Sequence, residues 1–423
     1  MCQQSHLGSR ADICSNVLTN SERGRWVVII LAVCFWIIWS QWATFFLGLT
    51  SWAIISNTGV LYDFFNLYQD GRWWLSAAYI NPQTHSLTYP FAYPPSSLPF
   101  FGFFALFSFG LAAQLWLAMS IAVFVIALLS LGLLLKSDRR YLFLSISALF
   151  FFTSYPLQVE LRLGQINLLI GSLTVLSLVS QRLRHRFVSA ALLAVGTLMK
   201  GPPILFLIYF VVFRRDLRYL VDFLTSMMVI LGLSLFVVPI QLYWYWLVNV
   251  VPSLFVASGS LTNESITGLI SLSGLTYLTP GILLGAVCLY ASFAFYVNSD
   301  RFKGSKRWPL RADAMFLMNT LALLILGSRV WSQDYVWVIL PVALFLSGLI
   351  MEEMKLAYFA FVGVAAFLFN FNTYPFFAYF IPQSATVIPM AIIGNLLMIP
   401  ALIMLYVRPS VILRDRARLA RSK

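Results

Sequence analysis

The sequence predicts an all-α integral membrane protein, a polytopic bundle of about twelve transmembrane helices. Hydrophobic residues make up 60% of the 423 residues and charged residues only 10%, whereas soluble domains carry ~25% charged residues. The mean hydropathy is +0.84. Aromatic residues reach 16%, which is typical of helices in lipid with rings at the interface. Such a chain cannot cover a surface that faces water.

Long apolar runs give the individual helices, since a span needs ~20 apolar residues and fewer when it is broken or surrounded by other helices. The twelve predicted spans lie near residues 27–48, 110–135, 141–155, 164–181, 187–200, 203–213, 219–240, 281–297, 314–328, 336–350, 356–370 and 387–407. Residues 96–109 form a further short apolar helix, which is split from the second span near Gly110.

The chain divides into three parts around this membrane region. Residues 1–25 are polar and form a cytoplasmic lead-in, because the apolar run that follows is long and lacks the small-residue cleavage site of a signal peptide. Residues 26–407 form a single transmembrane domain, with 51–95 as its first outer loop. Residues 408–423 form a basic cytoplasmic tail.

Basic residues are distributed unevenly between the two faces of the membrane. Twelve spans place both termini on one side, and 24 of the 28 Lys and Arg residues fall in segments on that side. Positive residues favour the cytoplasmic face. We therefore predict a multi-pass protein of the cell membrane with both termini in the cytoplasm and with membrane lipids as partners. The net charge of +13 sets this orientation, and no nucleic-acid partner is expected.

The few charges on the outer side are the candidates for function. Ionisable groups at membrane depth are costly and usually face a cavity or a partner. The outer cations are Arg72, Arg162, Lys200 and Arg329, and the outer acids are Asp63, Asp70, Glu160, Glu264 and Asp334. The chemistry is therefore expected at the extracytoplasmic face.

Asp63 stands in an aromatic run of the first outer loop. A carboxylate in apolar surroundings has a raised pKa and is suited to act as a general base. Two alternatives stay open, a helix N-cap and an ion pair with Arg72. Asp70 precedes Gly71, which favours a turn.

Two proline-containing segments interrupt the apolar runs. Tyr93-Pro94-Pro95 marks the point where the outer loop re-enters the membrane, because proline disfavours a helix interior. Lys200-Gly201-Pro202-Pro203 breaks an apolar hairpin. An ammonium there suits a phosphate, or it reaches toward water at the membrane edge.

The fourth span opens with Gly164-Gln165-Ile166-Asn167. Its neutral amides suit sugar hydroxyls, and equally helix capping or hydrogen bonds between helices. Glu160 and Arg162 are two residues apart, so each is expected to pair with other groups.

The late outer segments hold three more candidates. Arg329 offers planar donors for phosphate or carboxylate, and Asp334 either pairs with it or holds a substrate hydroxyl. Asn263 begins an N-glycosylation pattern and serves equally as a ligand contact. The four cysteines have no metal or disulfide spacing, and we expect neither a metal nor a cofactor.

The order of these segments resembles glycosyltransferase family 87. The shared features are an outer-loop Asp in an aromatic run, Tyr-Pro-Pro, Gly-Gln-x-Asn, a Lys-x-Pro helix break and a late outer loop with Trp. The resemblance covers roughly residues 25–405 and rests on the order and sidedness of the motifs. It implies the GT-C fold and an inverting, metal-independent transfer of a sugar. The implied donor is a polyprenyl-phosphate sugar, typically mannose or another hexose, and the acceptor is a glycolipid or glycan on the outer face.

The resemblance also implies roles for individual residues. Asp63 matches the catalytic aspartate, and Lys200 matches the lysine of the helix break. Candidates for the donor phosphate are Lys200, Arg329, Arg72 and Arg162. Candidates for sugar or acceptor contacts are Tyr93, Glu160, Gln165, Asn167, Asn263 and Asp334. Relatives often carry His in the late outer loop, where this chain has Gln333-Asp334-Tyr335, and Arg329 is the candidate replacement.

Two rival interpretations stay open. A transporter of a small molecule or lipid also uses broken helices, although the sequence has no internal repeat and only one clear break. The other rival is a membrane scaffold or lipid-handling protein without catalysis.

Overall fold

The computed structural model describes residues 61–77, 92–254, 279–297, 308–327, 330–352, 356–370 and 390–407, with single positions between 265 and 277. The chain divides into two compact units, Met1–Val60 and Leu61–Lys423, and all described residues belong to the second. The predicted first span and both cytoplasmic termini lie outside the described residues.

Every regular element in these ranges is a helix, which confirms the all-α class. The elements are α3 (Tyr62–Leu75), η1 (Pro95–Ser97), α4 (Leu98–Ala105), α5 (Phe109–Leu133), α6 (Ser137–Thr153), α7 (Tyr155–Leu163), α8 (Asn167–Arg182), α9 (Arg186–Lys200), η2 (Pro202–Leu205), η3 (Ile208–Phe213), α10 (Leu217–Leu235), α11 (Ile240–Tyr245), η4 (Trp246–Val250), α12 (Val251–Leu254), α14 (Thr279–Val297), α16 (Trp308–Leu326), η6 (Ser332–Val338), α17 (Ile339–Met351), α18 (Leu356–Asn370) and α20 (Met390–Val407). Each of the other eleven predicted spans coincides with one of these helices or with two consecutive ones.

Several helices are apolar enough to mark a membrane protein. By length and hydropathy, α5, α10 and the stretch Gln333–Met351 can each cross a bilayer, among the residues that are described. The consecutive helices α6 and α7, bent by 60°, make a fourth when taken together. The shorter apolar helices α14, α18 and α20 remain predicted spans.

The bend between α6 and α7 has a local cause. Pro156 lies in the first turn of α7, where a missing N–H costs nothing. The Ser154 hydroxyl caps the new helix by accepting a hydrogen bond from Leu157 N at 3.2 Å. A second break follows Lys200, as predicted, and is formed by Gly201 and the two prolines after it. The described chain thus has two broken segments where the sequence indicated one.

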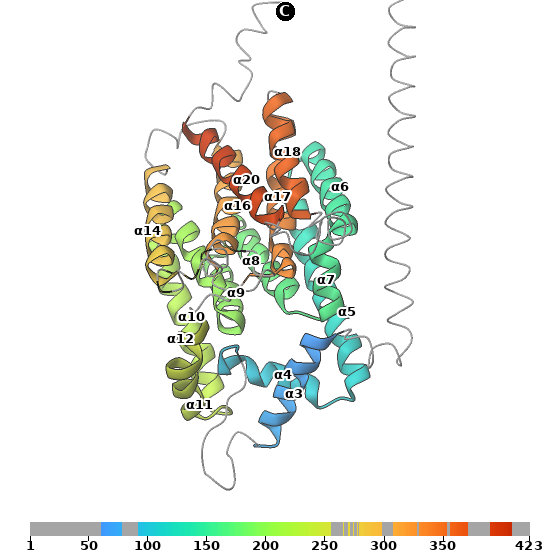
Figure 1. The fold of residues 1–423 in the computed structure, drawn as a ribbon, viewed down its shortest axis with the longest axis vertical. Helices are drawn as coiled ribbons and strands as arrows, with labels where there is room; N and C mark the ends of the chain where they lie inside the picture. The colour runs from blue at the N-terminus through green and yellow to red at the C-terminus, as the bar shows by residue number, and fades with distance from the viewer. Residues whose placement is uncertain are drawn as a thin grey trace, which may run out of the picture. The chain divides into compact units, whose positions relative to one another are not determined.

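The buried centre of the second unit is formed by α16 and α17. Residues 310–325 and 333–349 are buried on every face, as expected for helices that are hydrophobic all round. Helix α17 packs on α6, and α16 packs on α17 and α20. Helices α8, α9 and α10 pack side by side, and α8 also contacts α5 (Figure 1).

A buried ion cluster ties the centre to its neighbours. Asp313 of α16 is 1% exposed and accepts hydrogen bonds from Arg139 of α6, at 2.5 Å, and from Arg182 of α8. Arg139 also donates to the carbonyl of Leu344 in α17 at 2.8 Å. The sequence assigned these two arginines to membrane orientation alone. Burial of Asp313 gives them a structural role, because a buried carboxylate needs paired cations.

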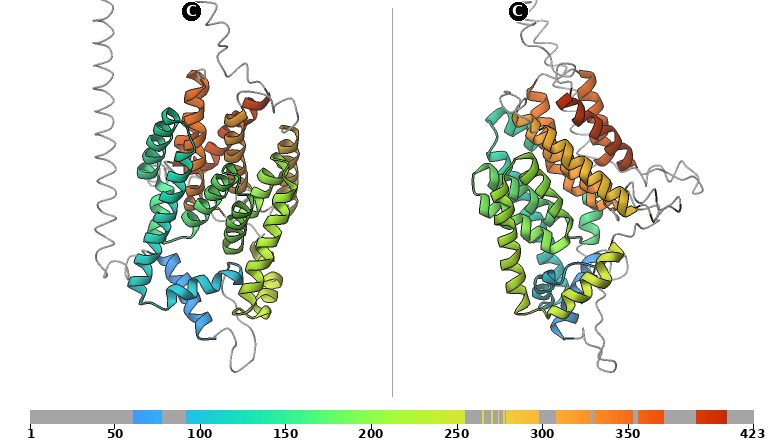
Figure 2. Two further views of the ribbon diagram at one scale, coloured as in Figure 1. Left: turned by 180° about the vertical axis from the view of Figure 1, so that it is seen from behind. Right: turned by 90° about the vertical axis from the view of Figure 1, so that its left-hand side faces the viewer.

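Helices α3 and α4 lie together at one end of the second unit (Figures 1 and 2). A Cβ at Gly71 of α3 would lie 2.5 Å from the carbonyl oxygen of Phe101 in α4. The absent side chain therefore allows the two backbones to approach closely. The sequence suggested a turn at Asp70-Gly71. That prediction was wrong, because both residues lie inside α3, where the glycine allows close packing against α4.

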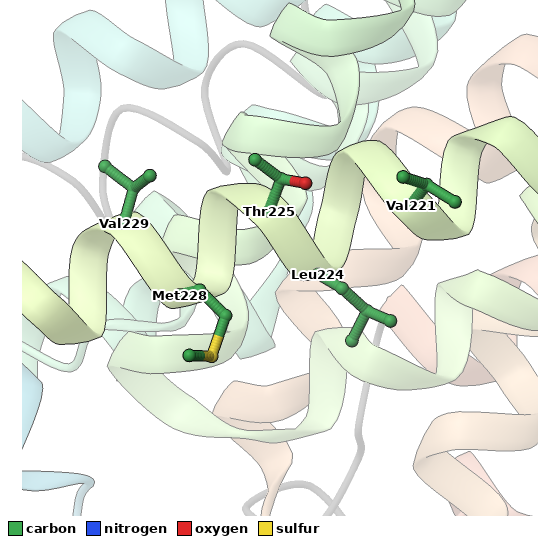
Figure 3. Close-up of a pocket in the computed structure, with 5 residues that line it drawn as sticks. All are labelled: Val221, Leu224, Thr225, Met228 and Val229. Atoms are coloured by element: carbon green, nitrogen blue, oxygen red, sulfur yellow. The ribbon is translucent and has the colours of Figure 1, made fainter.

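The outward face of α10 is apolar and exposed. Val221, Leu224, Thr225, Met228 and Val229 line a shallow hollow along this single helix (Figure 3). Met228 is 69% exposed. Such a face suits contact with lipid chains, and it holds none of the candidate site residues.

Candidate active site

Polar side chains from five separate segments gather near the start of α8 and the end of α9. They come from α3, the Tyr-Pro-Pro turn, the α7–α8 connection, the end of α9 and η6. The members are Asp63, Tyr93, Glu160, Gln165, Asn167, Lys200 and Asp334. All seven were candidates from the sequence, and the fold brings them into two connected hydrogen-bonded arms.

The first arm holds Asp63. The side-chain amide of Gln165 donates to Asp63 Oδ2 at 2.5 Å, and the Tyr93 hydroxyl donates to Gln165 Oε1 at 3.3 Å. Asp63 Oδ1 has no hydrogen-bond partner among the described residues. The described residues thus orient the carboxylate through Oδ2.

Both structural alternatives for Asp63 fail in the described residues. The N-cap of α3 is Leu61, and no side chain caps this helix. Arg72 lies nine residues further along the same helix, about 13 Å away along its axis, and its side chain is exposed. The contact of Asp63 is with Gln165 instead.

The second arm runs from Glu160 to Asp334. Asn167 Nδ2 donates to Glu160 Oε2 at 3.1 Å, and the ammonium of Lys200 donates to Asn167 Oδ1. The same ammonium pairs with Asp334 Oδ1 at 2.9 Å. Asp334 Oδ2 accepts from the backbone N–H of Trp331 at 2.9 Å. The Asp334 carboxylate therefore caps the start of η6 and also ties this helix to the end of α9.

Electrostatics in the cluster favour protonation of Asp63. Burial raises the pKa of Asp63 above its usual 3.8, although the hydrogen bond from Gln165 and the charge of Lys200 oppose the shift and Asp334 adds to it. Desolvation raises the pKa of Tyr93 to about 12, so its phenol remains a donor. Burial is therefore the main reason why this candidate base has a raised pKa.

Two contacts fix α3 against the α7–α8 connection. The backbone N–H of Leu61 donates to the Arg162 carbonyl at 2.5 Å. Gly164 has a left-handed backbone (φ +68°), and a Cβ there would lie 2.7 Å from Phe64 Cβ. Asp63 lies between Leu61, which directly precedes α3, and Phe64 in its first turn, so its position depends on both contacts.

Among the described residues, the side chains of two other candidates, Arg72 and Arg162, make no hydrogen bond or ion pair with the arms. The side chains of Arg72 and Arg162 are exposed. Arg329 and Asn263 lie outside the described residues. Lys200 is thus the donor-phosphate candidate that the described part of the chain places within the cluster.

One hydrogen bond that holds the site together was not predicted from the sequence. The Ser96 hydroxyl donates to the carbonyl of Leu198 at 2.8 Å, which holds the Tyr93 turn against the last turn of α9. The serine after Pro94-Pro95 was the available signal. It was not decisive, because a hydroxyl after prolines has many uses.

No metal site is evident in the described ranges, where no three His, Cys, Asp or Glu side chains are placed to hold an ion. What the site offers is an oriented carboxylate, a phenol, two amides and a lysine. These groups can accept a proton, bind hydroxyl groups and stabilise negative charge.

The apolar helices together with this buried polar cluster define the class of membrane proteins with a candidate ligand site. The chain belongs to glycosyltransferase family 87, whose sequence pattern matches residues 91–327. It is therefore a glycosyltransferase, with a sugar donor and an acceptor as substrates. The matched range includes α7, α8 and α9, whereas Asp63 precedes it and Asp334 follows it. The search of curated proteins found no match.

Proposed function

We propose that this protein is a GT-C-type glycosyltransferase that moves a hexose, such as mannose, from a polyprenyl-phosphate donor. The acceptor is a lipid or polysaccharide on the extracytoplasmic face, and the reaction inverts the anomeric centre. The observation that carries the proposal is the convergence of Asp63, Gln165, Asn167 and Lys200 in a chain of this family.

Asp63 is the general base in this proposal. The acceptor hydroxyl attacks the anomeric carbon and gives its proton to Oδ1 of Asp63, which accepts no hydrogen bond from the described residues. Gln165 holds the other oxygen, so the base is oriented before the substrate arrives. Its raised pKa improves proton transfer, since a base works best when its pKa lies near the working pH.

Lys200 stabilises the leaving group. As the bond between the anomeric carbon and the phosphate oxygen breaks, its electron pair remains on the phosphate, and preorganised cations stabilise this charge. Lys200 is paired with Asp334 at 2.9 Å, and the donor phosphate shares or takes over this ammonium. Arg329, Arg72 and Arg162 are further candidates for the phosphate. A phosphate leaving group needs no protonating acid, so one base suffices.

Sugar and acceptor hydroxyls are bound by the neutral groups of the cluster. Gln165, Asn167 and Tyr93 offer donors and acceptors near Asp63, and Asp334 and Asn263 remain candidates in the late segments. Glu160 was a candidate of the same kind, but it is 1% exposed.

The extracytoplasmic location rests on the separation of charges along α8. Asn167 at its start belongs to the site, whereas Arg182 at its end joins the Asp313 cluster. Arginine-rich segments favour the cytoplasmic face, so the site faces outward. The predicted partners are thus accessible from the outer leaflet.

The test compares D63N with D70N. Both aspartates lie on α3, but Asp70 makes no contact with either arm among the described residues. Purified protein is given synthetic polyprenyl-phosphate hexoses and a lipid extract, and products are identified by mass spectrometry. We expect a hexose-bearing product from wild type and D70N, and a loss of at least about 100-fold in D63N, the lower range of general-base contributions.

Full product from D63N would remove Asp63 from the mechanism. A wild-type protein that yields no hexose product, while cells lacking it lose uptake of a small molecule, would instead support a transporter.

A further inference from the structure

Glu160 closes the connection between α7 and α8 with both its backbone and its side chain. Its carbonyl accepts hydrogen bonds from the backbone of Gly164 at 2.9 Å and of Gln165 at 3.1 Å. Its carboxylate accepts from Leu168 N through Oε1 at 2.8 Å and from Asn167 Nδ2 through Oε2 at 3.1 Å. Both carboxylate oxygens are therefore occupied in a side chain that is almost fully buried.

The second observation concerns the polarity of the Asn167 amide. Asn167 is 0% exposed and lies between a carboxylate and an ammonium. A carboxylate only accepts hydrogen bonds and an ammonium only donates them. The amide must therefore turn its NH₂ toward Glu160 and its oxygen toward Lys200, as found. Glu160, as the acceptor, and Lys200, as the donor, thereby fix the direction of both hydrogen bonds of this amide.

We propose that Glu160 is a positioning residue, which orients Lys200 through Asn167 and does not bind the sugar. The inference rests on the proposed function, because it gives the ammonium of Lys200 its place at the donor phosphate. Burial supports it, since a side chain that is 1% exposed leaves a sugar hydroxyl almost no access to the carboxylate.

The same residue also supports the arm that holds Asp63. Gln165 receives its backbone anchor from the Glu160 carbonyl, and its side chain orients Asp63. The side-chain substitution E160Q leaves this carbonyl in place, so it tests the Lys200 arm separately from the Asp63 arm.

The substitution E160Q keeps the shape and removes the charge. The new amide can accept from Leu168 N with its oxygen, and its NH₂ then faces Asn167. The Asn167 amide must turn over to accept from it, which presents an NH₂ group to the ammonium of Lys200. We expect kcat/KM for the polyprenyl-phosphate hexose donor to fall about 10- to 100-fold, as for a lost hydrogen bond to a charged group.

A second substitution restores the polarity. In E160Q/N167D the carboxylate at position 167 accepts both from the amide at position 160 and from Lys200. The double variant has the net charge of the wild type, and its kcat/KM should recover to within about threefold of it. N167D alone places two carboxylates side by side, so its kcat/KM should fall at least as far as that of E160Q.

Thermal unfolding gives a readout that is independent of catalysis. Each single variant should lower the unfolding midpoint, and the double variant should lie above both, as a coupled pair requires. D313N is the matched structural control: it neutralises a buried carboxylate in the cluster at the far end of α8, and it should lower the midpoint without lowering kcat/KM.

The results separate the two claims. An E160Q protein with wild-type kcat/KM, or a double variant no better than the single variants in both readouts, overturns the positioning role. A wild-type protein that is inactive with every polyprenyl-phosphate hexose overturns the proposed function, while coupling in the unfolding midpoints still decides whether Glu160 and Asn167 act as a pair.

Discussion

Gly164 is the position where a single methyl group should disable the site. Its backbone has φ +68°, and a Cβ would lie 2.7 Å from Phe64 Cβ and 2.9 Å from Leu61 Cδ2. Phe64 belongs to α3 and Leu61 directly precedes it, so the two contacts lie on either side of Asp63. G164A should therefore push the start of α3 away from α7 and carry Asp63 with it.

The magnitude follows from two contributions. A left-handed backbone costs an L-residue roughly 1–2 kcal/mol, and overpacking in a tight contact typically costs about 1–3 kcal/mol. Together they amount to roughly 2–5 kcal/mol, shared between lost stability and displacement of α3. A shift of about 1 Å at a reacting group lowers the rate about 100-fold, so activity should fall more than stability.

The assay measures kcat/KM for the hexose donor and the unfolding midpoint of the same purified protein. G232A is the control, because a Cβ on Gly232 in α10 would meet nothing within 4 Å. It should keep wild-type activity. If G164A has wild-type kcat/KM and an unchanged midpoint, the contact with Phe64 does not position Asp63, and the account of α3 is wrong.

Three further predictions concern the polar cluster around Asp63 and the buried ion cluster around Asp313. Burial raises the pKa of Asp63 above 3.8, and a general base must be unprotonated. Activity should therefore fall on acidification while the pH is still above 3.8. A pH–rate profile that stays flat down to pH 3.8 contradicts this. D313N should lower the free energy of unfolding by about 3–5 kcal/mol, because Arg139 and Arg182 lose their shared carboxylate; thermal unfolding measures this, and a neutral effect would show that the arginines are solvated. Y93F removes a hydrogen bond of 3.3 Å worth about 1 kcal/mol, so kcat/KM should fall about fivefold, and a 100-fold loss would indicate a direct catalytic role for the phenol.

The candidate site was largely predictable because charge is rare in this chain. With 10% charged residues, acids and cations such as Asp63 and Lys200 stand out in the sequence. The neutral Gln165 and Asn167 are indicated instead by their place at the start of a helix. What could not be predicted was the pairing. Asp334 was assigned to Arg329 or a hydroxyl, whereas it binds Lys200, which is 134 residues away in the sequence.

Local signals misled where a long-range contact took precedence. Asp70-Gly71 has the composition of a turn, yet it lies within α3. Gly71 is there because the backbone of Phe101 approaches it closely. The sequence around Gly71 does not show that Phe101 packs against it.

The sequence by itself determined the class of protein, the positions of the apolar helices and a short list of polar candidate residues. These follow from composition and from periodic patterns, which are local properties. Only the tertiary structure decided which carboxylate faces the ammonium of Lys200, why Glu160 is buried and why Asp313 draws two arginines. Such pairings depend on distances between helices that are far apart in the chain, and burial makes them obligatory because an unpaired charge there is too costly.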